Sequence, residues 1–288
     1  MRFNKPLRAL GAALFGLVLA HAADRAADLK LPNAEKSVRF AMIGDNGTGL
    51  KPQYDIGALM SEYRAVFPYD FVVMLGDNIY GGQSPADFKR KFELPYAQLL
   101  GAGVKFFAVL GNHDGTSERY YKLFNMEGRR YYNYKRDDVE FFALDSNYMD
   151  PEQLNWLREQ LKKSSAKWKI CYFHHPLYSD GKKHGPDLDL RRLLEPLFIE
   201  TGVNVVLSGH EHFYERIKPK SGIAYFVLGN SGELRPNNLR RSTDVDKGFD
   251  TDQSFGLMEI SGDELHYQVI ARDGKTVDNG VVAMPKKK

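Results

Sequence analysis

The chain has 288 residues, a formal net charge of +3, 43% hydrophobic residues and a single cysteine. This hydrophobic fraction is typical of globular proteins and excludes an intrinsically disordered chain. One cysteine excludes an internal disulfide framework and a structural zinc site built from thiolates. The length is sufficient for one large domain or two small ones with a buried core.

The N-terminal residues 1–22 have the three parts of a secretory signal: a basic start, a short apolar stretch and an A-x-A sequence at 20–22. The apolar stretch over 9–20 is too short to span a bilayer as a membrane anchor. We therefore expect cleavage after Ala22, no membrane anchor afterwards and a periplasmic or secreted location. Loss of the three basic residues of the signal lowers the formal charge from +3 to 0. Composition therefore gives no indication of nucleic-acid binding.

The small, charged and aperiodic residues 23–36 predict a linker. Beyond it, five short apolar runs are continuous rather than alternating, which is typical of strands covered on both faces. These runs are VRFAMIG (38–44), DFVVMLG (70–76), VKFFAVLG (104–111), WKICYF (168–173) and VNVVLSG (203–209).

The segments between these runs have the apolar spacing of helices, and later segments resemble hairpin strands. Helices are expected at 52–66, 85–100, 151–164 and 187–200. Further strands are expected at 131–135, 140–145, 223–229, 255–261 and 264–271. This order predicts an α/β domain with a mixed sheet or two packed sheets. We expect this single domain over 37–273, followed by a C-terminal tail over 274–288.

Each of the five apolar runs leads directly into side chains that can bind a metal ion. They are Asp45, Asp77, Asn112 with His113, His174 with His175, and His210 with His212. In open α/β sheets, sites form at the carboxyl ends of the strands, so we expect these side chains to converge. Taken singly, Asp45 is equally consistent with a helix cap or turn, and His210 with His212 is equally consistent with a structural loop. The whole set in this order favours a metal site.

The donor types of these residues indicate the class of metal. Carboxylate, amide carbonyl and imidazole without thiolate suit Fe, Mn or Zn. The candidates are too many for one ion and suit two ions that share a bridging carboxylate. Paired metals of this kind hydrolyse phosphate esters.

The blocks at the strand ends resemble the five motifs of calcineurin-like metallophosphoesterases. They are G-D-N-G (44–47), G-D-N-I-Y (76–80), G-N-H-D (111–114), F-H-H-P (173–176) and G-H-E-H (209–212). Within that family they are similar to the purple acid phosphatases, especially the short, tartrate-resistant type. Gly47 stands where many members have the histidine of Asp-x-His, and Tyr80 stands where purple acid phosphatases have a tyrosinate ligand. His184-Gly185-Pro186 is similar to a further family feature near the phosphate.

The resemblance implies a four-layer αββα sandwich with two mixed β-sheets and a dinuclear metal site at the carboxyl ends of the strands. It implies a first metal bound by Asp45, Asp77, Tyr80 and His212. It implies a second metal bound by Asp77, Asn112, His174 and His210, with Asp77 bridging. Because tyrosine ordinarily loses its proton at about pH 10, its ligation requires a strongly polarising cation. We therefore expect Fe(III) at the first position and Fe(II), Zn(II) or Mn(II) at the second; the alternative for Tyr80 is a packed core side chain.

The activity that the resemblance implies is that of an exported acid phosphatase, with small phosphomonoesters as substrates and a hydroxide held by the metals as nucleophile. His113 and His184 are the expected catalytic residues, and with Asn112 they are expected to contact the substrate. His175 stands at a position that varies in the family, and both a structural and a rim role stay open for it. The alternatives are a phosphodiesterase or nucleotide pyrophosphatase on the same scaffold and a non-catalytic metal-binding module.

The stretch 213–250 is expected to form a long irregular loop. It contains four arginines among Gly, Asn and Pro: Arg216, Arg235, Arg240 and Arg241. We favour a solvated surface loop over one that shapes substrate access.

Overall fold

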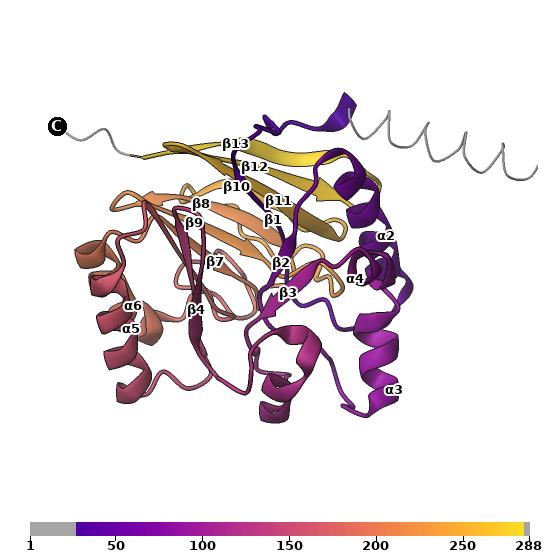
Figure 1. Ribbon diagram of the computed structural model, residues 1–288, viewed down its shortest axis with the longest axis horizontal. Coiled ribbons are helices and arrows are strands. Elements are labelled where there is room, and N and C mark those ends of the chain that lie inside the picture. The colour runs from indigo at the N-terminus through magenta and orange to yellow at the C-terminus, as the bar shows by residue number, and fades with distance from the viewer. Residues whose placement is uncertain (1–26, 285–288) are drawn as a thin grey trace, which may run out of the picture.

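The computed structural model describes residues 27–284 of the chain. The secretory signal expected at 1–22 and the last residues, 285–288, lie outside the described residues. The described chain forms two packed β-sheets with helices on both outer sides (Figure 1), which confirms the expected αββα sandwich. No helix within 27–284 has the length and apolar character needed to cross a membrane.

The first sheet has the strand order β13-β12-β11-β1-β2-β3. Its strands are β1 (Val38–Ile43), β2 (Phe71–Met74), β3 (Lys105–Ala108), β11 (Ser254–Ser261), β12 (Glu264–Ala271) and β13 (Thr276–Ala283). The first three run parallel to one another, and the last three continue the sheet as antiparallel hairpins. The carboxyl ends of β1, β2 and β3 therefore lie at one edge of this sheet.

The second sheet has the strand order β10-β8-β9-β7-β6-β5-β4. Its strands are β4 (Tyr132–Arg136), β5 (Val139–Ala143), β6 (Trp168–Tyr172), β7 (Val205–Ser208), β8 (Tyr214–Lys220), β9 (Ile223–Leu228) and β10 (Val245–Phe249). The four central strands, β5, β6, β7 and β9, are parallel, and the others pair antiparallel. Both sheets are therefore mixed, as expected.

The helices cover the outer faces of the two sheets (Figure 1). On one side are α2 (Lys51–Val66), α3 (Pro85–Phe88) and α4 (Ala97–Gly101), and on the other are α5 (Pro151–Lys163) and α6 (Leu188–Thr201). The α5 helix begins at Asp150, whose carboxylate accepts the backbone N–H of Gln153 at 2.8 Å, and Pro151 occupies the first turn. Its apolar side packs with α6 on the second sheet in a buried cluster that also contains Cys171.

Three segments differ from the expectation. The helix expected over 85–100 is divided into α3, a π-helical turn η1 (Lys89–Glu93) and α4. Thr276–Ala283, expected within a tail, forms the edge strand β13. In the expected linker, the backbone N–H groups of Asn33 and Ala34 donate to the buried carboxylate of Glu259 at 2.7 and 2.6 Å, so this segment is attached to the first sheet.

The prediction of an irregular solvated loop over 213–250 is wrong for about half of its length, because β8, β10 and β9, the last expected as a strand over 223–229, fall within it. Arg216, expected in solvent, pairs with Asp278 and Asp246 at 2.8 Å each. Asp278 also accepts the hydroxyl of Tyr214 at 2.7 Å, which joins β8 of the second sheet to β13 of the first. Paired charges allow this segment to be half-buried although its sequence is polar.

Candidate metal centre

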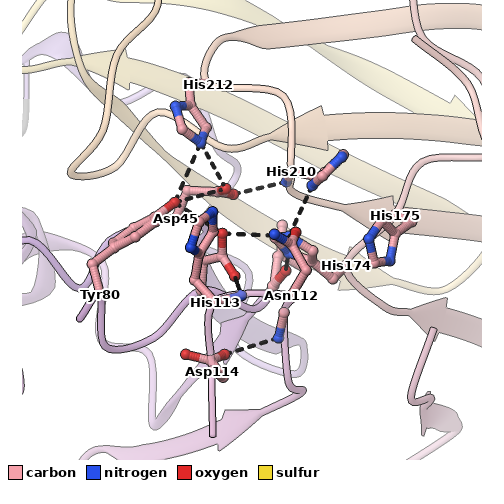
Figure 2. A network of polar contacts seen from close by, with 12 residues as sticks. Asp45, Tyr80, Asn112, His113, Asp114, His174, His175, His210 and His212 are labelled. Carbon is pink, nitrogen blue, oxygen red and sulfur yellow. Dashed lines mark hydrogen bonds and ion pairs between the residues drawn. The ribbon is translucent and has the colours of Figure 1, made fainter. Parts of the chain in front are cut away.

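The side chains expected to bind metal meet where the carboxyl ends of β1, β2 and β3 face those of β6 and β7 (Figure 2). The residues brought together there are Asp45, Asp77, Tyr80, Asn112, His174, His210 and His212. They come from both sheets, so the site depends on how the two sheets pack. They form two groups of donor atoms.

The first group surrounds the hydroxyl oxygen of Tyr80. This oxygen lies 3.2 Å from Asp45 Oδ1, 3.0 Å from Asp77 Oδ2 and 3.3 Å from His212 Nε2. His212 Nε2 is also 3.3 Å from Asp45 Oδ1. Donor atoms around an ion with bonds of about 2.0–2.2 Å are separated by comparable distances. The group therefore has the dimensions of one coordination shell.

The second group is centred on Nε2 of His174. The Nδ1 of this ring lies 2.9 Å from the backbone carbonyl of Leu75, which can only accept, so Nδ1 carries the proton and Nε2 presents a lone pair. That lone pair faces the acceptor Oδ1 of Asn112 at 3.0 Å and Oδ2 of Asp77 at 3.6 Å. His210 Nδ1 lies 3.1 Å away. Acceptors that face one another in this way fit a cation between them, and the carbonyl contact on Nδ1 is typical of a metal-binding histidine.

Burial without a counter-ion shifts the pKa values of these groups in the direction that favours their neutral forms. Burial, followed by the charge of Asp77, raises the pKa of Asp45 well above its ordinary value. Burial also raises the pKa of Asp77 and, together with the two carboxylates, that of Tyr80. It lowers the pKa of His212 to about 4. A bound cation would reverse the carboxylate and phenol shifts, because it favours the ionised ligands.

Three of these residues have an unusual backbone conformation. Asp45, Asp77 and His210 have φ values of 51°, 52° and 71°, in the left-handed region that residues other than glycine rarely adopt. The conformations are held by hydrogen bonds within the site: Asp45 N–H donates to the carbonyl of Gly76 at 3.0 Å, and His210 N–H donates to Asp45 Oδ2 at 2.8 Å. Such strain is common at functional sites, where the surrounding structure imposes it.

The two histidines expected to be catalytic lie at opposite ends of the donor groups. The ring of His113 is 5.0 Å from that of Tyr80, and its backbone N–H donates to Asp77 Oδ1 at 2.9 Å. The ring of His184 is 4.4 Å from that of His210. Both side chains are exposed, so each is accessible to a molecule at the site.

His175, whose role the sequence left open, belongs to the second group. Its Nδ1 lies 2.9 Å from the hydroxyl of Ser146, which also accepts the backbone N–H of His175 at 3.1 Å. Its ring is 4.5 Å from that of His210, and His174, His175 and His210 together form a cluster able to hold a metal ion. Ser146 thus fixes the orientation of a third imidazole beside this group.

Asp114, to which the sequence motifs assigned no role, positions two loops of the site. Its carboxylate accepts the backbone N–H groups of Asn78, Ile79 and Gly111 at 2.7, 3.0 and 2.8 Å. It therefore ties the loop after β2, which carries Asp77, to the loop after β3 (Figure 2). The position of Asp114 at the end of the G-N-H-D block is the sequence feature that could have indicated this role.

Glu211 is a second positioning residue without a role assigned from sequence, and it is fully buried between His210 and His212. Its carboxylate accepts the backbone N–H of Gly185 at 2.6 Å and the side-chain amide of Asn238 at 3.0 Å. It therefore holds the segment that carries His184 next to the metal-binding loops. The position of Glu211 between two histidines is the one sequence feature that points to this contact.

The sequence is similar to those of known proteins. The family model of calcineurin-like phosphoesterases matches residues 38–214. Tartrate-resistant acid phosphatase type 5 of Homo sapiens is 24% identical over 295 residues, which cover 85% of this chain and 90% of that protein.

Solved structures share the fold. GAP50, the anchor in the inner membrane complex of Plasmodium, has a TM-score of 0.75 at 21% identity, with 88% of this chain and 90% of that chain covered. The purple acid phosphatase PPD1 from yellow lupin seeds has a TM-score of 0.71 at 17% identity, with 89% of this chain and 55% of that chain covered.

Proposed function

Because this chain belongs to the calcineurin-like phosphoesterase family, we propose that it is an acid phosphatase that hydrolyses phosphomonoesters at a dinuclear metal site. The observation that carries the proposal is the position of Asp77 between the two donor groups. Its Oδ2 lies 3.0 Å from the Tyr80 hydroxyl and 3.6 Å from His174 Nε2. One carboxylate that reaches both groups suits a bridging ligand. The similarity to an acid phosphatase supports the substrate class.

The proposed ligands follow from the two groups. The first metal would be held by Asp45, Asp77, Tyr80 and His212, and the second by Asp77, Asn112, His174 and His210. A phenol at the first position favours Fe(III), because a trivalent cation is needed to displace a proton of such low acidity. The second position, with imidazole, carboxylate and amide donors, suits Fe(II), Zn(II) or Mn(II).

When bound, the two cations would polarise the phosphoryl oxygens and make a water molecule nucleophilic. The residues of this chain would then act on the substrate from two ends. Asn112, of the second group, and His113, beside the first, would hold phosphoryl oxygens, and His184 would give a proton to the leaving alcohol beside the second group. An imidazole is suited to this transfer at acidic pH, where it carries the proton. The separate positions of His113 and His184 permit this division of roles.

The first alternative, a phosphodiesterase or nucleotide pyrophosphatase, is distinguished by its substrates. We expect metal-loaded protein to hydrolyse p-nitrophenyl phosphate with a higher kcat/KM than bis(p-nitrophenyl) phosphate, and chelation of the metals to abolish both activities. A preference for the diester would identify a phosphodiesterase instead.

A specific observation also raises the second alternative, a module that has lost catalysis, because GAP50 shares the fold and is described as an anchor. Here neighbouring atoms of the proposed donors lie 3.0–3.6 Å apart, and no proposed ligand is replaced by a residue that cannot bind metal. A complete donor set supports catalysis over a purely structural role. Metal-loaded protein without activity on any phosphomonoester would support the non-catalytic module.

The sequence of residues 1–22 supports export of the chain, with a periplasmic or secreted mature protein. Mass spectrometry of protein from the exported fraction of its native host is expected to find Ala23 or a near neighbour at the N-terminus. Recovery of intact Met1 would contradict export by a cleaved signal.

A further inference from the structure

Two segments that are distant in sequence pair beside the second donor group. Gly181 and Leu239 form an antiparallel bridge, Lys182 N–H donates to the carbonyl of Asn238 at 2.8 Å, and Arg240 N–H donates to that of Asp180 at 3.0 Å. We call residues 180–185 and 237–240 the basic ribbon. His184, which contacts the ring of His210, lies on it.

The basic ribbon carries cations that have few carboxylate partners. Lys182 Nζ donates to the carbonyl of Asn237 at 2.7 Å, and Arg240 Nη2 donates to the carbonyl of Lys182 at 3.4 Å. Lys183 is exposed, and its charge lowers the pKa of His184. The acids in contact with the ribbon are Asp180, which binds the backbone of Ser242, and three buried carboxylates that accept its backbone N–H groups: Glu211, Glu215 and Asp250, the last paired with Arg241. The exposed side chains of the ribbon, Lys182, Lys183 and Arg240, are therefore cationic, whereas the three other carboxylates that contact it are buried.

Arg235 adds a further cation at the inner side of the ribbon. The segment that leads to it crosses the metal-binding loops: Ser231, Glu233 and Arg235 donate their backbone N–H groups to the carbonyls of Gly44, Asp45 and His212 at 3.1, 2.9 and 2.9 Å. Arg235 is therefore attached directly to the loop of a proposed metal ligand. This part of 213–250 shapes the site and is not a solvated loop.

The guanidinium of Arg235 is available for a ligand. Its Nη1 is buried, and it has no hydrogen-bond partner among residues 27–284. After burial, the charge of Arg235 is the largest cause that lowers the pKa of both His184 and His212, so the guanidinium lies near both. A buried donor without an acceptor is unfavourable, and an anionic ligand would satisfy it. Arginine is well suited to phosphate because its N–H groups bind two oxygens at once.

We propose that Arg235, with the basic ribbon, binds a second phosphate group carried by the leaving group of the substrate. This proposal rests on the proposed phosphatase function and specifies its substrate class. The transferred phosphoryl group would be held at the metal-binding residues and His113, whereas the ribbon lies with His184 and Arg235 lies near both His184 and His212. The preferred substrates are therefore phosphate compounds whose departing portion is itself phosphorylated.

The test compares two substrates with leaving groups of similar acidity but different charge: p-nitrophenyl phosphate and inorganic pyrophosphate. Hydrolysis of pyrophosphate uses one water molecule, breaks one P–O–P linkage and yields two phosphate ions. We expect Arg235→Gln to lower the kcat/KM ratio of pyrophosphate to p-nitrophenyl phosphate at least about tenfold, the effect of losing a hydrogen bond to a charged group. Arg235→Lys is expected to recover part of this ratio.

Arg158→Gln is the matched control, because Arg158 lies on α5 and its guanidinium contacts Asn155 on the same helix. It should leave the ratio unchanged. Lys183→Gln is a second test variant at an exposed position of the ribbon, where folding is not at risk, and it should lower the ratio in the same direction. Equal losses on the two substrates in Arg235→Gln and Lys183→Gln would overturn the proposal and assign these cations to the transferred phosphoryl group.

A binding measurement gives an independent readout. Methylenediphosphonate, which cannot be hydrolysed at its P–C–P linkage, and methylphosphonate are compared by calorimetry on metal-loaded protein. Arg235→Gln should weaken binding of the diphosphonate about tenfold more than binding of the monophosphonate. An unchanged ratio of the two Kd values would also overturn the proposal. If wild-type protein hydrolyses neither substrate, the proposed function itself fails, whereas hydrolysis with an unchanged ratio in the variants defeats only this inference.

Discussion

The backbone carbonyl of Gly47 accepts the backbone N–H of Tyr80 at 3.0 Å. The N–H of Gly47 in turn donates to the carbonyl of Asp77 at 3.3 Å, so the loops after β1 and β2 are in direct contact. A Cβ atom on Gly47 would lie 2.0 Å from the carbonyl oxygen of Asn78. No larger side chain fits at this position without moving the loop that carries Tyr80. The glycine and the tyrosine are therefore two parts of one arrangement.

We predict that Gly47→Ala disrupts the first donor group. The added methyl group meets backbone atoms, which cannot rotate away, so Tyr80 and Asp77 must shift. Overpacking of this kind destabilises proteins by about 1–3 kcal/mol, or roughly 2–4 °C in Tm for each kcal/mol. Calorimetry and metal analysis should show a lower Tm and a lower metal content. The matched control is Gly101→Ala on α4, because a Cβ there meets nothing within 4 Å.

Tyr80→Phe should remove a visible absorption band from iron-loaded protein. A phenolate bound to Fe(III) gives a charge-transfer colour, and phenylalanine lacks the oxygen. Part of the activity should remain, because Asp77 and the second donor group are unchanged. Visible spectra of aerobically loaded wild-type and variant protein provide the measurement. A pink to purple wild type and a colourless variant are expected; an identical band in the variant would mean that Tyr80 is not the ligand.

Removal of the general acid should slow hydrolysis most for esters that have poor leaving groups. We predict that His184→Ala slows hydrolysis of an alkyl phosphate by a further factor of about 10²–10⁴ compared with hydrolysis of a phenyl phosphate. The reason is that a departing alkoxide requires a proton, whereas a departing phenolate requires it less. His113→Ala should slow both esters to a similar degree, since its ring lies beside Tyr80. Steady-state kinetics on both esters tests this assignment. A larger alkyl effect in His113→Ala would reverse the two roles.

Stability should fall with rising pH because of Glu215. Burial raises the pKa of this side chain to about 8, and it accepts the backbone N–H of Asp180. Above its unfolded value of about 4.3, the unfolded state loses the proton that the folded state retains, so the contribution of Glu215 to stability is full below that pH and is lost as the pH rises to about 8.

The Tm of metal-free wild-type protein should therefore fall more between pH 5 and pH 8 than the Tm of Glu215→Gln does. The two decreases should differ by about 2–4 °C or more. Thermal melts at both pH values measure this difference. Glu200→Gln is the control, because Glu200 is an exposed partner of Lys162. The same pH dependence in wild type and Glu215→Gln would rule out this origin.

The central strands and the donor residues could be predicted because one physical feature produces both signals. A strand buried on both faces needs a continuous apolar run, and the polar residue that follows marks its carboxyl end. The strand β8 and the edge strands β10 and β13 lack such runs. The sequence around Arg216 on β8 predicts a solvated charge, but Asp278 of the other sheet pairs with this arginine. Pairing between sheets leaves no periodic pattern.

The left-handed backbone at Asp45 and the anchoring role of Glu211 were also beyond prediction from the sequence. The first depends on hydrogen bonds from loops of both sheets, including the N–H of His210. The second depends on Gly185 and Asn238, which approach Glu211 only in the folded chain. Local sequence records which residues can bind a metal, but not what holds them in place.

The most direct test of the central claim is the number of metal ions per chain in wild type and in Asp77→Asn, measured by elemental mass spectrometry after metal loading and gel filtration. Because Asp77 reaches both donor groups, we predict about two ions per chain in wild type and one or fewer in the variant. Asp77→Ala, measured in the same way, should show the same loss of bound metal ions. Two ions retained in either variant, or one ion or fewer in wild type, would contradict a dinuclear site bridged by Asp77.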